Sequence, residues 1–93
     1  IGVNMELTGA VAAYGKAEQN GIKLAVDEIN KAGGVDGKKL ELVTKDNKSE
    51  NAEASTSSTN LAIQSNVNAI VGPATSGAVA AASLVSQKQG FLC

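Results

Sequence analysis

Apolar residues alternate with other residues at the start of the chain. They stand at every second position: Ile1, Val3, Met5 and Leu7. Because a repeat of two residues places these side chains on one face of an extended segment, residues 1–7 are predicted to form a short buried strand. Residues 8–15 contain two glycines and are predicted to form a turn that runs into a helix.

The spacing of apolar residues becomes helical in the next segment. Apolar side chains recur three and four residues apart, at Ile22, Ala25, Val26 and Ile29. This pattern is typical of a helix with one apolar face. Gly33 and Gly34 follow, and we expect them to end the helix because glycine adopts the left-handed conformation at little cost.

A tight turn and a second strand are predicted after these glycines. Residues 35–39 read VDGKK, which is typical of a turn. Residues 40–46 are predicted to form a strand, with Leu40 and Leu42 on one face and Val43 on the other.

Two helices and two strands are predicted in the remainder of the chain. Residues 49–65 predict a helix rich in serine and threonine, and residues 67–72 a short buried strand. A third helix is expected from Ser76 to Gln89, ending at Gly90. Residues 91–93 read FLC and are predicted to begin a fourth strand.

This order of strands and helices predicts an α/β fold. Strands that alternate with helices indicate a parallel sheet covered by helices on both faces, a three-layer α-β-α arrangement. With the sheet order 2-1-3, the first helix covers one face, and the second and third helices cover the other. Ligands of such sheets bind where the strand order reverses, at the C-terminal ends of the strands. Residues 8–14 and 72–76 are expected to lie there.

Thr75 and Ser76, at the start of the third predicted helix, allow two interpretations. Their hydroxyl groups can cap the helix by accepting from a free backbone N–H. Alternatively, the free N–H groups, the positive end of the helix and a hydroxyl donor can together bind a carboxylate. A phosphate-binding loop is excluded, because Ala78 and Val79 follow residues 72–77 (GPATSG) where that motif requires lysine and a hydroxyl residue.

Tyr14 and the pair Asp46 and Asn47 also allow two interpretations each. Tyr14 can pack on the sheet, or it can lie over the mouth of the crevice and contact an apolar ligand group. Gly9 and Gly15 around it permit close approach of the backbone. Asp46 and Asn47 can line the rim of the crevice, but their residue types favour capping of the next helix.

Composition excludes several classes of protein. The chain has 93 residues and a net charge of −1, with eight lysines and no arginine, so a nucleic-acid binder is disfavoured. It has no histidine, and Cys93 is its one cysteine. A zinc site and Ser–His or Cys–His catalysis are therefore not expected. We expect neither an enzyme nor a metal or cofactor site.

Two long stretches carry a resemblance to a known family. They read TGAVAAYGKAEQNGIKLAVDEINKAGGVDGKKLELVTKDN and VNAIVGPATSGAVAAA. The chain resembles the leucine/isoleucine/valine-binding proteins, type I periplasmic binding proteins that serve ABC transporters. Members of that family have two α/β lobes. The resemblance implies that residues 1–93 are an incomplete N-terminal part of the first lobe.

The resemblance also implies roles for four residues. Ser76 matches the serine that binds the α-carboxylate of the ligand through its hydroxyl and backbone N–H. Ala74 and Thr75 match residues that line that pocket, and Tyr14 matches a tyrosine that packs on the ligand side chain. The remaining ligand-binding residues of the family come after the fourth strand and from the second lobe.

The function implied is extracytoplasmic binding of a branched-chain or similar small aliphatic amino acid, for delivery to the membrane permease of an importer. The intact protein would be free in the periplasm or anchored as a lipoprotein. The alternatives are the sensing lobe of a receptor with the same fold and a stand-alone flavodoxin-like signalling domain. We expect the separate chain to bind ligand weakly and to self-associate through its open sheet edge.

Overall fold

The computed structural model describes residues 1–65 and 67–90. Its elements are β1 (Gly2–Met5), α1 (Ala12–Lys31), β2 (Val43–Asp46), α2 (Asn51–Thr59), the π-helical turn η1 (Asn60–Gln64), β3 (Ile70–Val71) and α3 (Ser76–Gln89). The predicted alternation of strands and helices is confirmed. The predicted fourth strand, at 91–93, lies outside the described residues, as does Cys93.

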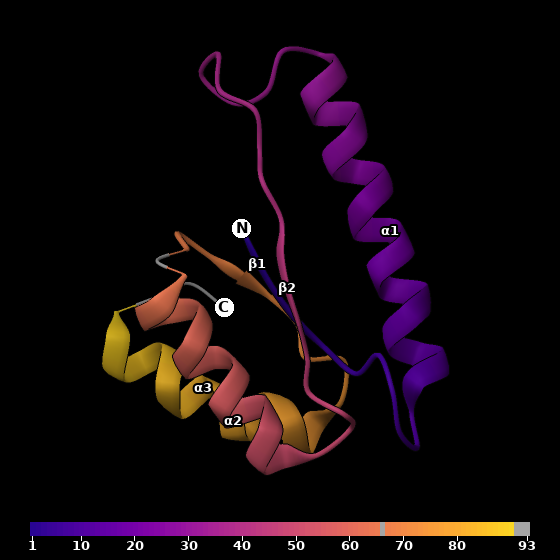
Figure 1. Ribbon diagram of the computed structural model, residues 1–93, viewed down its shortest axis with the longest axis vertical. Helices are drawn as coiled ribbons and strands as arrows, with labels where there is room; N and C mark the ends of the chain where they lie inside the picture. Colours follow the sequence, from indigo (N-terminus) through magenta and orange to yellow (C-terminus); the bar gives the residue numbers. More distant parts are fainter. Residues whose placement is uncertain (66, 91–93) are drawn as a thin grey trace.

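The three strands form a parallel sheet in the order β2-β1-β3, as predicted (Figure 1). Gly2 of the central strand β1 pairs with Val43 of β2 on one side and with Ile70 of β3 on the other. Each connection contains a helix, because parallel neighbours need a long crossover. The carboxyl ends of all three strands therefore meet at one edge of the sheet.

Helices cover both faces of this sheet, and the side chains of β1 show which helix covers which face. Asn4 donates hydrogen bonds of 2.8 Å to the Ala54 carbonyl and of 2.8 Å to the Ser58 hydroxyl, both in α2. Met5 points the other way and lines a groove together with Ile22 of α1. The prediction that α1 covers one face and that α2 and α3 cover the other is confirmed (Figure 1).

The core is small and built mostly from aliphatic and alanine side chains. Its buried apolar residues are Val3, Met5, Val26, Ala54, Leu61, Ile70, Ala78 and Ala82. Small side chains allow α2 and α3 to pack closely. At the start of α3, a Cβ on Gly77 would lie 3.0 Å from the Asn51 side chain of α2.

The second strand is shorter than predicted. It begins at Val43, which pairs with Gly2 of β1, rather than at residue 40. The backbone of Leu40 is held instead by the side chain of Asn30 in α1. Asn30 Oδ1 accepts from the Leu40 N–H at 2.7 Å, and its Nδ2 donates to the Leu40 carbonyl at 3.0 Å.

The ends of α1 follow the sequence pattern. The helix stops at Lys31, and Gly33 and Gly34 both have positive φ, of 108° and 81°. The Gly34 N–H donates to the Ile29 carbonyl at 2.9 Å, which closes the last turn of the helix. The turn at residues 35–39 is also confirmed, with Val35 bridged to Lys38.

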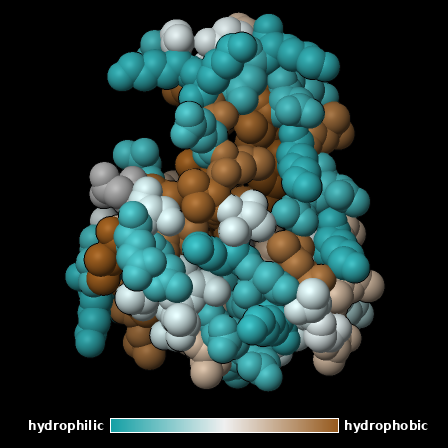
Figure 2. Space-filling view, in the orientation of Figure 1, coloured by the Kyte–Doolittle hydropathy of each residue, from teal (hydrophilic) through white to brown (hydrophobic). Residues whose placement is uncertain are grey.

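The predicted apolar face of α1 is only partly buried. Val26 is buried, but Ile29 is 38% exposed, and Ile22 and Ala25 border a groove beside β3. A helix of 20 residues spans about 30 Å, whereas a four-residue strand spans about 13 Å, so the described sheet covers only part of α1. Figure 2, in the orientation of Figure 1, shows apolar side chains gathered in the middle of the molecule. No helix in the described ranges is long and apolar enough to cross a membrane.

Candidate functional site

The candidate site lies where the carboxyl ends of the strands meet the first turns of the helices (Figure 1). Three connections converge there: residues 6–11 after β1, residues 47–50 after β2 and residues 72–75 after β3. Two carboxylates, those of Asp46 and Glu6, hold these connections together.

Asp46 joins the connection after β1 to the connection after β2. Its Oδ1 accepts from the backbone N–H groups of Leu7 at 3.0 Å, Thr8 at 3.2 Å and Lys48 at 2.8 Å. Its Oδ2 accepts from the Thr8 hydroxyl at 2.7 Å. Burial by itself raises the pKa of Asp46, but the hydrogen bonds from Thr8, Lys48 and Leu7 outweigh it, so the pKa is below its ordinary value.

Ser49 makes a second link between the same two connections. Its hydroxyl donates to the Thr8 carbonyl at 2.7 Å and accepts from the Val11 N–H at 3.3 Å. Val11 is the residue directly before α1, so this link fixes the start of that helix. The first turn of α1, which carries Tyr14, is thus anchored to the connection after β2.

The prediction that Asp46 and Asn47 cap α2 is wrong. The N-cap residue of α2 is Glu50, and its side chain makes no cap hydrogen bond. Asn47 is completely buried, and its Nδ2 donates to Asn4 Oδ1 at 3.0 Å and to Glu6 Oε1 at 3.2 Å. A buried amide must find partners inside the protein, and those partners lie on β1 and directly after it rather than at the helix end.

Glu6, just after β1, is fully buried and reaches the connection between β3 and α3. Its Oε1 accepts from the Ala74 N–H at 3.0 Å. Its Oε2 accepts from the Thr75 N–H at 2.9 Å and from the Thr75 hydroxyl at 2.8 Å. Burial raises the pKa of Glu6, but the hydrogen bonds from Ala74, Thr75 and Asn47 outweigh it and lower the pKa below its ordinary value.

Neither the Thr75 nor the Ser76 hydroxyl caps the start of α3 in the part of the chain that the structure describes. Thr75 is the N-cap residue by position, with φ −112° and ψ 151°, but its side chain makes no cap bond. The Thr75 hydroxyl donates to the nearby Glu6 carboxylate instead, because a buried anion competes strongly for donors. Ser76 is exposed, and its hydroxyl makes no hydrogen bond in the described part of the chain.

Tyr14 lies in the first turn of α1 and is 69% exposed. The interpretation that it packs on the sheet is therefore wrong. The neighbouring Gly15 is buried instead, and a Cβ there would lie only 1.8 Å from the Glu6 carbonyl oxygen. The expected close approach at Gly15 is confirmed, and so is that at Gly9, where a Cβ would lie 2.5 Å from the Lys48 carbonyl oxygen.

The part that Glu6 and Asn4 play in this site was not predicted from the sequence. Both stand at even positions of an otherwise apolar strand, and both are completely buried. The signal was available, since a parallel strand covered on both faces has no solvent face on which to place polar side chains. Polar residues there require internal partners.

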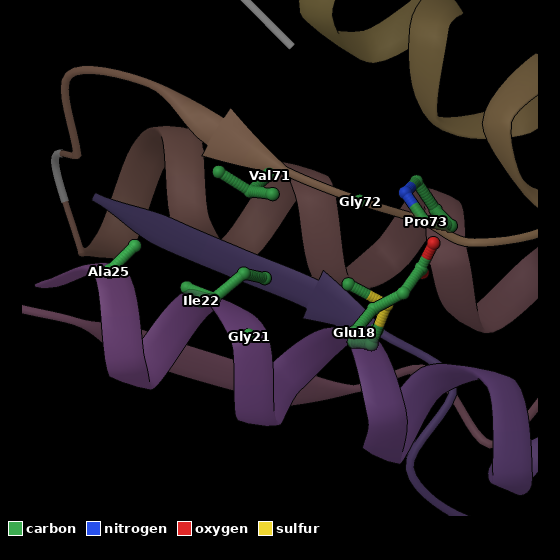
Figure 3. Close-up of a pocket in the computed structure, with 8 residues that line it drawn as sticks. Glu18, Gly21, Ile22, Ala25, Val71, Gly72 and Pro73 are labelled. Carbon is green, nitrogen blue, oxygen red and sulfur yellow. The ribbon is translucent and has the colours of Figure 1, made fainter.

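A groove of about 430 Å³ lies between α1 and β3 (Figure 3). Met5, Ile22 and Val71 contribute to its apolar wall, and Glu18 and Pro73 lie at one end of it. None of the four predicted site residues lines this groove. It flanks the edge of β3, the outer strand of the described sheet on this side.

The start of α3 offers hydrogen-bond donors to an anion. The first N–H groups of a helix have no partner within that helix, and they attract anions. The exposed Ser76 adds a hydroxyl donor at the same helix end. No group of three or more potential metal ligands occurs among residues 1–65 and 67–90.

Replacing Asp46 with asparagine is expected to loosen the two connections and to lower the free energy of unfolding. Folding lowers the pKa of Asp46, so the ionised side chain stabilises the folded state. This stabilisation is complete above about pH 4, the ordinary pKa of aspartate, and it is lost as the pH falls through the lowered pKa. The difference between wild type and D46N in urea unfolding should therefore shrink on acidification. The exposed Asp27→Asn serves as the control. A difference that persists unchanged at pH 2 would contradict this role.

Comparisons with known proteins agree with this geometry. A family model described as periplasmic binding protein matches residues 1–92. The Leu/Ile/Val-binding protein BraC3 of Rhizobium johnstonii is 41% identical over 92 residues, which are 99% of this chain and 25% of the relative.

Solved structures give the same result. The branched-chain amino acid transporter substrate binding protein LivJ of Streptococcus pneumoniae, in complex with isoleucine, is 62% identical, with a TM-score of 0.95 over 97% of this chain and 26% of LivJ. The leucine binding protein LivK of Thermotoga maritima is 27% identical, with a TM-score of 0.86 over 95% of this chain and 24% of LivK.

The chain thus spans about a quarter of the length of the relatives it matches. Within that quarter, the family match covers almost every residue, and the fold is that of the solved neighbours. The family consists of solute-binding proteins rather than enzymes. This chain belongs to the periplasmic binding protein family.

Proposed function

We propose that residues 1–93 are the incomplete N-terminal lobe of a two-lobe binding protein that takes up a branched-chain or similar small aliphatic amino acid. The observation that carries the proposal is the exposed start of α3, where Ser76 stands at the carboxyl edge of the parallel sheet. A relative of 62% identity was solved with isoleucine, which supports this class of ligand.

Ser76 is the residue to which we assign the α-carboxylate of the ligand. Its hydroxyl and backbone N–H would both donate to the carboxylate, with the positive end of α3 adding attraction. Ala74 and Thr75 would line the pocket beside it. Tyr14, exposed in the first turn of α1, would pack on the aliphatic side chain of the ligand.

The proposed partner is the membrane permease of an ABC importer, and the proposed location is outside the cytoplasm, either free or lipid-anchored. Binding to this lobe would be followed by closure of a second lobe over the ligand. Such a hinge motion removes the ligand from water and produces a closed form that the permease can distinguish from the open one.

Ser76→Ala tests the proposal in the full-length protein. A hydrogen bond to a charged group contributes about 1.5–3 kcal/mol, so the affinity for isoleucine should fall roughly 10- to 100-fold. Isothermal titration calorimetry measures the change. Ser83→Ala is the matched control, since Ser83 lies exposed on the same helix and its hydroxyl donates to the Val79 carbonyl. Equal affinities of S76A and wild type would refute the assigned carboxylate site.

A further inference from the structure

We propose that Glu6 is a positioning residue for the ligand carboxylate, although it does not touch the ligand. This inference rests on the proposed function. By fixing the backbone of Ala74 and Thr75, the Glu6 carboxylate would hold Ser76 with its hydroxyl and N–H directed toward the crevice.

The hydrogen bonds of Glu6 leave little freedom in the segment before α3. Both carboxylate oxygens are used, Oε1 by the Ala74 N–H at 3.0 Å and Oε2 by the Thr75 N–H and hydroxyl at 2.9 and 2.8 Å. Three donors from two consecutive residues are thereby bound to one side chain. The residue that follows them in the chain is Ser76.

Glu6 is itself held in place from the opposite side. Asn47 Nδ2 donates to Glu6 Oε1 at 3.2 Å and to Asn4 Oδ1 at 3.0 Å. Asn4 in turn donates to Ser58 of α2 at 2.8 Å. A continuous buried hydrogen-bond network therefore connects α2, through β1 and the connection after β2, to the start of α3. Fully satisfied networks of this kind specify one arrangement of the elements that they join.

The same geometry determines which donors remain for a ligand. Glu6 uses the N–H groups of Ala74 and Thr75, which precede the helix, and makes no hydrogen bond with the described atoms of Ser76. A second carboxylate can then be received only from Ser76 onward, on the exposed side of the helix start. At this helix end, the Glu6 carboxylate thus occupies the donors of Ala74 and Thr75, and the donors of Ser76 are left for the carboxylate of a ligand.

Two opposing effects of Glu6 make the inference testable. As a nearby negative charge, Glu6 would weaken binding of a carboxylate, so removing its charge would raise affinity. As a positioning residue, it would strengthen binding, so removing it would lower affinity. In Glu6→Gln, an NH₂ group replaces one oxygen and cannot accept from the Thr75 or Ala74 N–H.

The experiment uses the full-length protein as wild type, E6Q, S76A and the double variant, titrated with isoleucine. E6Q should bind at least about 10-fold more weakly than wild type. Because Glu6 acts through Ser76, and the backbone N–H of residue 76 remains in S76A, the E6Q change should cost less affinity in the S76A background than in wild type. Glu28→Gln, an exposed glutamate of α1, is the matched control and should leave affinity unchanged.

Several outcomes would overturn the inference. Unchanged or higher affinity of E6Q would show that Glu6 acts only as a charge or not at all. If E6Q lowered the affinity by the same factor in the wild-type and S76A backgrounds, the loss would be a general structural effect. A loss of affinity in S76A without a loss in E6Q would leave the proposed function standing and refute the positioning role alone.

A second variant covers the case in which E6Q does not fold. Thr75→Val removes only the hydroxyl donor to Glu6 Oε2 and keeps both backbone hydrogen bonds. A several-fold loss of affinity is expected, with the melting temperature of the ligand-free protein lowered by only a few degrees. The loss should be smaller in the S76A background, and an equal loss there would count against the inference.

Discussion

Replacing Gly15 with alanine is expected to destabilise the protein by about 2 kcal/mol or more. A Cβ at this position would lie 1.8 Å from the Glu6 carbonyl oxygen and 2.5 Å from the carbonyl carbon. These are backbone atoms at the end of the central strand, so the helix must move away from the sheet. Overpacking usually costs about 1–3 kcal/mol, and a clash with backbone atoms lies at the upper end of this range or beyond it. Alanine favours the helix over glycine by about 1 kcal/mol, which offsets only part of that cost.

Gly21→Ala is the matched control within the same helix. Gly21 is exposed, and a Cβ there meets no atom within 4 Å, so alanine should stabilise the helix by up to about 1 kcal/mol. Urea unfolding of the full-length variants measures both changes. Similar free energies of unfolding for the two variants would show that α1 does not rest on the end of β1 as described. Because Gly15 follows Tyr14, G15A should also weaken ligand binding.

The separate 93-residue chain is expected to bind leucine with a dissociation constant in the millimolar range or weaker. Two charge-assisted hydrogen bonds from Ser76 contribute about 1.5–3 kcal/mol each, whereas association costs at least about 4 kcal/mol. The net free energy of binding is therefore favourable by about 2 kcal/mol at best, which corresponds to a dissociation constant of about 30 mM. Calorimetry on the separate chain and on the full-length protein measures the difference.

Circular dichroism of the separate chain is the necessary control, because an unfolded chain would also fail to bind. A helical spectrum together with a micromolar constant would contradict the prediction. The same sample also tests self-association. Val71 of β3 is 41% exposed, and an open, uncharged strand edge favours pairing with another chain. Sedimentation is expected to show dimers or larger species, and a clean monomer at high concentration would refute this.

The helices of this protein were largely predictable from local signals. Gly33 and Gly34 mark the end of α1 because the left-handed conformation needed there is inexpensive only for glycine. Gly90 ends α3 in the same way, with φ 69° and ψ 36°. These are properties of single residues and their neighbours, so they can be recognised without knowledge of the fold.

Strand limits were less predictable, because pairing depends on a partner elsewhere in the chain. Nothing in residues 40–42 distinguishes them from Val43 as strand residues. In the structure, the Ile1 amino group donates to the Glu41 carbonyl at 2.8 Å, and the side chain of Asn30 takes both backbone groups of Leu40. The Asn30 contacts join residues ten positions apart, and no strand pattern reveals them.

The roles of polar residues in the site were the hardest to predict. Asp46 and Asn47 have the residue types of helix caps, and local sequence supported that interpretation. In the fold, Asp46 finds donors in the Leu7–Thr8 segment, and Asn47 finds acceptors on Asn4 and Glu6. Those partners are about 40 residues away in the chain, so no local pattern could reveal them.

The sequence by itself determined the order of elements and the parallel character of the sheet, and with the commonest strand order it predicted the edge at which Ser76 and Tyr14 stand. Hydrophobic periodicity and the glycines that end helices are local features, so they can be recognised within a few residues. Alternating strands and helices are compatible with few topologies. Only the tertiary structure decided that Thr75 donates to Glu6 rather than capping α3, and that Gly15 rather than Tyr14 lies against β1. Burial decides both, because a buried carboxylate takes the nearest donors and a close contact of backbones excludes every side chain.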